Sequence, residues 1–226
     1  MKHMIIVAHP DDEVLGLGGF IYDRIQRGDD VCVVIANEAD IPTRPGMTED
    51  LDRSHAILGI RQRYGLGLEN LNVSAYSPAY VVPRMEQIVA AFMPDYIFTH
   101  APGDINPDHQ AVSGFVQQTA RYYQRQQNRC RIAGLFFIEV LSSTDWGADT
   151  FKPDTYLEVS SEGLDRKIEA LSCYQNVLRH DTHPRSERAI KALATFRGCT
   201  VGVRFAEALK TCWRIEQEGR HGEDCL

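Results

Sequence analysis

Two groups of side chains in this sequence could bind a catalytic metal ion. The first directly follows an apolar run, residues 4–8, and consists of His9, Asp11, Asp12 and Glu13. The second follows another apolar run, residues 96–99, and consists of Asp104, Asn106, Asp108 and His109. A mononuclear catalytic zinc takes three nitrogen or oxygen ligands from the protein and keeps a fourth position open for water. Each group offers such ligands, so a site forms if the fold brings the two groups together.

Both groups also carry the marks of a helix start, which is the competing explanation. Pro10 ends the first apolar run, and either Asp11 or Asp12 is suited to cap the helix that follows. Asn106 is suited to cap a second helix, with Pro107 at its first position. For either group alone, capping and an ordinary hydrogen-bonded histidine explain the residues equally well. The occurrence of both groups after apolar runs favours a metal site.

The elements that must position these groups alternate between strands and helices. Continuous apolar runs predict buried strands at residues 4–8, 31–36, 96–99 and 135–140, with a short strand at 64–68. Helical spacing of apolar residues predicts helices at residues 14–28, 49–58, 82–92 and 109–127, and residues 37–47 read as a loop. This order predicts an α/β fold with a Rossmann-like, mostly parallel sheet flanked by helices. Ligands of such sheets bind at the carboxyl ends of the strands, where both groups fall.

Three glycines, Gly16, Gly18 and Gly19, lie in the first predicted helix. They lack the G-x-G-x-x-G spacing of a dinucleotide site, and the carboxylates beside them would repel a pyrophosphate. We therefore expect these glycines to allow close packing of the helix on the sheet.

The length of 226 residues predicts one domain, residues 1–226. Residues 1–142 form its Rossmann-like core. Beyond residue 143 the alternation fades, and two helical patterns, at 164–178 and 186–195, flank the polar segment 180–185. We expect residues 143–226 to form a smaller C-terminal subdomain that covers the substrate.

Composition excludes several classes of protein. A net charge of −7 argues against a nucleic-acid-binding surface, which needs clustered Lys and Arg. No apolar run approaches the roughly 18 residues of a membrane span, and the N-terminus lacks the pattern of a signal peptide. The six cysteines form no C-x-x-C pair. A cytoplasmic location is the expectation.

The sequence also resembles a known family at these same residues. Residues 8–13, A-H-P-D-D-E, are identical to a signature of the LmbE-like, or PIG-L, family of zinc-dependent N-acetylglucosamine deacetylases. Residues 106–109, N-P-D-H, are similar to the family's second signature, H-P-D-H, and depart from it at Asn106. Further similarity around Arg53 and at residues 138–140, 183–186 and 197–208 extends the resemblance over most of the chain.

The resemblance implies roles that spacing alone does not decide. It implies that His9, Asp12 and His109 bind Zn²⁺, that Asp11 is the general base, and that Asp108 orients a neighbour by hydrogen bonding. Histidine and carboxylate ligands also accept Fe²⁺ or another divalent metal. The implied reaction removes the N-acetyl group from a small-molecule amino-sugar conjugate and releases acetate, and the implied assembly is a homo-oligomer.

The departure at Asn106 changes the expected proton transfer. An amide can donate a hydrogen bond to an oxyanion, but it cannot deliver a proton at neutral pH. Either Asp11 returns the proton that it took, which we favour, or another group such as His183 supplies one.

Three residues are candidates for substrate binding: Arg53, His183 and Arg185. Arg53 could bind a carboxylate or another oxygen-rich group, and an ion pair with Glu49 or Asp50 is the competing explanation. His183 and Arg185 lie in a polar connector that could close over the sugar or simply be solvated.

Two other functions fit the same residues. One is an amidase acting on a different amide, such as a thiol-sugar conjugate, and the other is a non-catalytic zinc- or sugar-binding protein. The presence of Asp11 disfavours the non-catalytic protein, because a purely structural site gains nothing from an unligated carboxylate.

Overall fold

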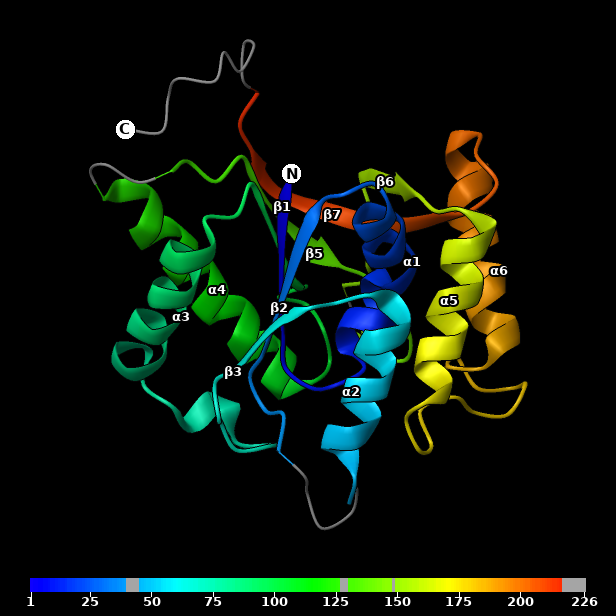
Figure 1. Ribbon diagram of the computed structural model, residues 1–226, viewed down its shortest axis with the longest axis horizontal. Coiled ribbons are helices and arrows are strands. Elements are labelled where there is room, and N and C mark those ends of the chain that lie inside the picture. Colours follow the sequence, from blue (N-terminus) through cyan, green and yellow to red (C-terminus); the bar gives the residue numbers. More distant parts are fainter. Residues whose placement is uncertain (40–44, 127–129, 148, 217–226) are drawn as a thin grey trace.

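The computed structural model describes residues 1–39, 45–126, 130–147 and 149–216 (Figure 1). Its elements are, in chain order, β1 (Lys2–Val7), α1 (Asp12–Gln26), β2 (Asp30–Ile35), α2 (Met47–Leu58), β3 (Gln62–Gly65), the 3₁₀ helix η1 (Val73–Ala75), α3 (Pro78–Phe92), β4 (Tyr96–His100), α4 (Pro107–Arg125), β5 (Gly134–Ile138), β6 (Thr155–Glu158), α5 (Ser161–Ser172), α6 (Glu187–Val201) and β7 (Ala206–Arg214).

All seven strands form one sheet in the order β3-β2-β1-β4-β5-β7-β6. The strands from β3 to β5 are parallel, while β7 runs antiparallel to both β5 and β6. The chain leaves β1 towards β2 and β3 on one side, and then returns to β4 and β5 on the other. Strand order therefore reverses between β1 and β4, which is where such folds bind their ligands.

Side chains alternate across the sheet and create a core on each face. Met4 and Ile6 of β1 pack into one apolar cluster, and Ile5 and Val7 pack into the other. Helices α3 and α4 cover the first face, on the left of Figure 1, and α1, α2, α5 and α6 lie on the right. Both faces of β1, β2, β4 and β5 are mostly buried, which explains their largely apolar sequences, whereas the parallel edge strand β3 is only partly buried.

The glycines of α1 allow the close packing that the sequence predicts. A Cβ at Gly16 would lie 2.8 Å from Cδ1 of Ile138, and one at Gly19 would lie 2.4 Å from Cγ1 of Val159. Real Cβ contacts are longer than this, so the glycines let α1 approach β5 and the segment after β6.

The predicted α/β class is confirmed, with differences at individual elements. The short strand expected at 64–68 is β3, at Gln62–Gly65, and α3 begins at Pro78, before the expected residue 82. Two strands, β6 and β7, were not predicted, and through them the described part of the chain after residue 143 extends the same sheet. Residues 40–44 of the expected loop and residue 127 of the expected helix lie outside the described residues.

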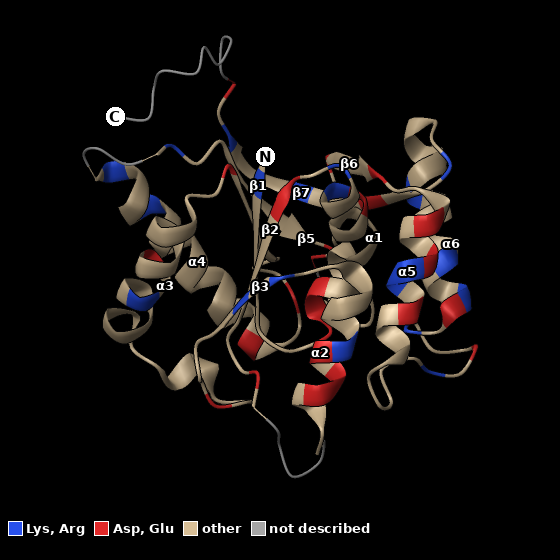
Figure 2. Ribbon diagram, viewed as in Figure 1, with Lys and Arg blue, Asp and Glu red and all other residues tan. Residues whose placement is uncertain are grey.

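Charge is distributed unevenly over the helices. Figure 2 shows acidic residues gathered on α2, whereas on α5 and α6 the Lys and Arg residues are interspersed with Asp and Glu. Among the helices that the structure describes, none is both long enough and apolar enough to cross a membrane.

Candidate metal centre

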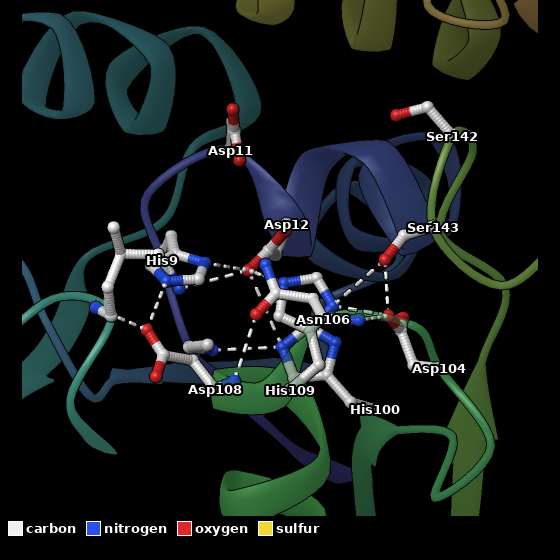
Figure 3. Close-up of polar contacts among 12 residues, drawn as sticks. His9, Asp11, Asp12, His100, Asp104, Asn106, Asp108, His109, Ser142 and Ser143 are labelled. Atoms are coloured by element: carbon white, nitrogen blue, oxygen red, sulfur yellow. Dashed lines mark hydrogen bonds and ion pairs between the residues drawn. The ribbon is translucent and has the colours of Figure 1, made fainter. Parts of the chain in front are cut away.

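The point where strand order reverses brings the two groups of polar residues together. His9 and Asp12 lie just after β1, and His109 lies in the first turn of α4, after β4. Oδ2 of Asp12 lies 3.3 Å from Nδ1 of His9 and 3.2 Å from Nε2 of His109. Figure 3 shows the two rings and the carboxylate converging. Three residues from two distant segments thus present their ligand atoms to one point.

These three residues fit a divalent metal. Their ligand atoms all lie within 4.8 Å of one another. Ligands of a tetrahedral zinc with bonds of about 2.0–2.1 Å are separated by roughly 3.3 Å, which matches the two measured distances. Two imidazole nitrogens and one carboxylate oxygen are also the donor set of a catalytic site, which leaves a coordination position open.

Each histidine of this set is oriented by a second carboxylate. Nε2 of His9 lies 3.1 Å from Oδ2 of Asp108, and Nδ1 of His109 lies 2.9 Å from Oδ2 of Asp104. Such carboxylate partners fix the ring orientation and the tautomer of metal-binding histidines. Nε2 of His9 and Nδ1 of His109 are therefore occupied by these carboxylates. Nδ1 of His9 and Nε2 of His109 remain to face a metal.

Asp108 also fixes one wall of the site. Its carboxylate accepts backbone hydrogen bonds of 2.7 Å from Leu71 and 3.1 Å from Val73, in addition to contacting His9. The segment between β3 and α3 is thereby joined to a candidate metal ligand.

The carboxylates control protonation in the metal-free protein. Burial lowers the pKa of His9, but hydrogen bonds to Asp108 and Asp12 outweigh burial and raise that pKa to about 9. Burial likewise opposes protonation of His109, while Asp12 and Asp104 raise its pKa to about 10. Both rings therefore hold an extra proton near neutral pH until a metal displaces it.

Asp11 stays apart from the three ligands, as Figure 3 shows. Its backbone is left-handed, with φ of 100°, and its side chain makes no capping hydrogen bond to α1. Nη1 of Arg185 donates to Oδ2 of Asp11 over 3.5 Å, and Nε of the same guanidinium donates to Ser142 over 2.7 Å. A buried carboxylate beside the metal ligands is thus held by a residue from the connector between α5 and α6.

A cavity of about 250 Å³ opens onto this centre. The three proposed ligands form part of its lining, and the other lining residues are Asp11, Asn37, Met47, Asn70, Leu71, Asn106 and Arg185. Most of these other residues are polar or charged, so the cavity suits a ligand rich in hydroxyl and amide groups.

Asn106 caps α4 as expected, because its Oδ1 accepts a 2.9 Å hydrogen bond from the backbone N–H of Asp108.

Two of the predicted substrate-binding residues do not line this cavity. Arg53 pairs with Asp50, and its guanidinium is largely exposed in a separate surface pocket. His183 is partly exposed, and its Nδ1 accepts a 2.9 Å hydrogen bond from the backbone of Arg185. Of the three candidates, the structure brings only Arg185 to the cavity beside the candidate metal ligands.

Sequence reasoning missed His100, the last residue of β4. Its side chain is fully buried, and its ring stacks on His109 with centroids 3.8 Å apart. Burial and the neighbouring His109 lower the pKa of His100 to about 4, so the ring is neutral at neutral pH. The sequence could have identified His100 by its position, because it is a histidine that ends an apolar strand where the strand order reverses.

Asp104 belonged to the second group of residues but had no assigned role. Besides orienting His109, it accepts a hydrogen bond from the hydroxyl of Ser143 and one of 2.8 Å from the backbone of Asn106. It therefore links β4, α4 and the loop after β5 around His109, one of the candidate metal ligands.

Comparison with known proteins shows which family the chain resembles. The model of a protein family described as GlcNAc-PI de-N-acetylase (PIG-L) matches residues 4–120, which include both groups of site residues. The diacetylchitobiose deacetylase of Thermococcus kodakarensis is 25% identical over 226 aligned residues, which cover 92% of this chain and 82% of that protein.

Solved structures share the fold. The conserved protein TT1542 from Thermus thermophilus has a TM-score of 0.77 at 21% identity, and the match covers 95% of this chain and 96% of that one. The 4-carboxy-2-hydroxymuconate hydratase GalB from Pseudomonas putida has a TM-score of 0.76 at 18% identity, and the match covers 97% of this chain and 100% of that one. Because a hydratase shares this fold with deacetylases, the reaction must be argued from the site.

Proposed function

The chain belongs to the GlcNAc-PI de-N-acetylase (PIG-L) family, and we propose that it is a metal-dependent hydrolase that removes the N-acetyl group from an amino-sugar conjugate. The products are acetate and the free amine of the sugar. The relative from Thermococcus kodakarensis is named for a reaction of this kind on diacetylchitobiose, which supports the proposal.

One observation carries the proposal: His9, Asp12 and His109 converge at the edge of a cavity, with Asp11 beside them but not among them. A structural metal would need a closed ligand set, and this set is open towards the cavity. An unligated carboxylate next to it is the group that hydrolysis of an amide requires.

We assign the metal to His9, Asp12 and His109, with zinc as the first choice and Fe²⁺ as an alternative. When bound there, the metal supplies Lewis acidity, which polarises the amide carbonyl and makes a water molecule a stronger acid. Asp104 and Asp108 keep the two histidine rings in the orientation that binding needs.

Asp11 acts as the general base and takes a proton from the attacking water. The new bond joins the water oxygen to the carbonyl carbon, and negative charge develops on the carbonyl oxygen. Asn106 then donates a hydrogen bond to that oxygen, because its own Oδ1 is engaged in capping α4 and its amide nitrogen is left for the cavity.

Collapse of the intermediate breaks the bond between carbon and nitrogen, and the leaving amine needs a proton. Asp11 holds the proton that it took and returns it to the nitrogen. His183 is a poorer donor for this step, since it lies outside the cavity lining and its Nδ1 accepts a hydrogen bond from the backbone of Arg185.

Arg185 both anchors Asp11 and faces the sugar, whereas Arg53 would meet only a substrate that extends beyond the cavity.

The test is a product analysis on the metal-loaded protein. N-acetylglucosamine and N,N'-diacetylchitobiose are incubated with the zinc and iron forms, and acetate and free amine are measured separately. Equal amounts of the two products are expected. Release of amine without acetate from other amide conjugates would indicate an amidase, and binding without any product would indicate a non-catalytic protein.

The assembly is a separate part of the proposal. The family resemblance supports a homo-oligomer, and sedimentation of the purified chain at several concentrations would test it. A single species with the mass of one chain would contradict this assignment.

A further inference from the structure

His100 contacts the segment that carries the first metal ligand. Its Nε2 accepts a 2.9 Å hydrogen bond from the backbone N–H of Ala8, the residue before His9. The pairing of β1 with β4 ends at Ile6 and Thr99, so this bond lies beyond the last paired residues. The imidazole thus continues the connection between the two strands to the edge of the metal centre.

The same ring touches the other two ligands. It lies almost parallel to the ring of His109, with an interplanar angle of 13° and centroids 3.8 Å apart. Its Nε2 is also 3.4 Å from Oδ2 of Asp12. One fully buried side chain therefore contacts two of the three proposed ligands, Asp12 and His109, and the residue before the third, and these contacts come from both sides of the switch point.

His100 is not itself placed to bind the metal. A backbone N–H can only donate, so the lone pair on Nε2 of His100 is occupied by Ala8. His100 also forms a second possible group of ligands with Asp104 and His109. In that group the contact between Asp104 and Nδ1 of His109 is already a hydrogen bond, which orients His109 for the first group.

We propose that His100 is a positioning residue for the metal centre, setting the separation of His9, Asp12 and His109 by its hydrogen bond to Ala8 and its stacking on His109. This inference rests on the metal site of the proposed function. Partners outside the ligand set typically change metal affinity by about 10- to 100-fold when they are replaced. His100 should have an effect of that size, although it donates no ligand atom.

Two variants separate the two contacts. H100F keeps a flat ring against His109 but removes the acceptor for Ala8. H100Q keeps an acceptor on a side chain of similar reach but removes the ring. Because each variant loses one of the two contacts, we expect each to weaken zinc binding by about 10- to 100-fold.

His3 provides a matched control. It is also a buried histidine, it lies in β1, and its ring stacks on Tyr96 of β4, at the opposite end of the same pair of strands. H3F should destabilise the protein as a core substitution does, but it should leave zinc affinity unchanged.

The experiment measures the zinc dissociation constant by competition with a chromophoric chelator, and urea unfolding of the metal-free proteins. The expected result is weaker zinc binding in H100F and H100Q but not in H3F, at comparable losses of stability. Wild-type zinc affinity in folded H100F or H100Q would overturn the inference. If H100F does not fold, H100Q alone decides it. Failure of the wild-type protein to bind zinc would instead contradict the proposed function.

Discussion

The side-chain oxygen of Asn106 accepts a 2.9 Å hydrogen bond from the backbone N–H of Asp108. That bond caps α4 and engages the amide oxygen, while Asn106 also lines the cavity. Asn106 therefore combines an observed structural role with the oxyanion-donor role that we propose for it, and the two can be separated by substitution.

The first prediction concerns this residue. Ser caps helices about as well as Asn, so N106S should preserve stability to within about 0.5 kcal/mol. Ser has no amide nitrogen to reach the oxyanion, and loss of such a donor lowers kcat by about 10²- to 10³-fold. Steady-state kinetics and urea unfolding on the same preparation check both parts. A large loss of stability with unchanged kcat would mean that Asn106 is only a cap.

The second prediction separates two adjacent aspartates. D11N should retain zinc, because Asp11 lies outside the ligand set, but kcat should fall by about 10²- to 10⁴-fold as general-base catalysis is lost. D12N is the matched control, since it alters a proposed ligand and should lose zinc. Elemental analysis and kinetics distinguish the two variants. Near-normal kcat in zinc-loaded D11N would remove Asp11 from the role of base.

The third prediction is the pH dependence of metal binding. Burial opposes protonation of His9 and His109, but the carboxylates that contact these two rings raise the pKa of His9 to about 9 and that of His109 to about 10. Raised values mean that both rings are protonated below these pH values, and each proton must leave before a metal can bind. Zinc affinity should therefore increase between pH 6 and pH 9, by up to about tenfold per pH unit for each proton released.

Histidines with an unperturbed pKa of about 6.5 would place this dependence near pH 6. The carboxylates that contact His9 and His109 shift the pH dependence of zinc binding to higher pH. Chelator competition across the pH range, with proton release measured in weak buffer, checks the prediction. An affinity that is flat between neutral and alkaline pH would show that the rings are already neutral there.

The parallel half of the fold and the position of the candidate metal centre were predictable for a common reason, whereas the choice of His9, Asp12 and His109 as ligands came from the family resemblance. Strands buried on both faces are continuously apolar, so β1, β2 and β4 stand out in the sequence, and polar residues at their carboxyl ends are conspicuous. His9, Asp12 and His109 lie at those ends.

The antiparallel edge of the sheet could not be predicted in the same way. β6 is only partly buried, and the second half of β7, residues 210–214, is partly exposed. The residues of these two strands therefore mix polar and apolar types without a clear period. Long-range contacts were equally hidden. The hydrogen bond from Ala8 to His100 and the pairing of Arg185 with Asp11 depend on how distant segments meet, which no local pattern records.

The last prediction concerns a contact that supports α1 from the far end of the chain. Helix α1 is kinked at Leu17, and the carboxylate of Glu207 accepts hydrogen bonds of 3.1 Å from the backbone N–H of Gly19 and 2.8 Å from that of Phe20. Nζ of Lys167 lies 2.7 Å from the same carboxylate, and both side chains are almost fully buried. Glu207 therefore satisfies the backbone donors freed by the kink and pairs with a buried ammonium group.

Removing the charge of Glu207 should be costly, because it leaves Lys167 buried without its partner. We expect E207Q to lower the free energy of unfolding by about 3–5 kcal/mol. The exposed pair of Glu187 and Lys191, also 2.7 Å apart, is the matched control, and E187Q should cost no more than about 0.5 kcal/mol. Urea unfolding of the metal-free proteins measures both values without a contribution from metal binding. Equal effects of the two substitutions would mean that burial of the Lys167 pair does not govern its contribution, and that the kinked helix is held by apolar packing instead.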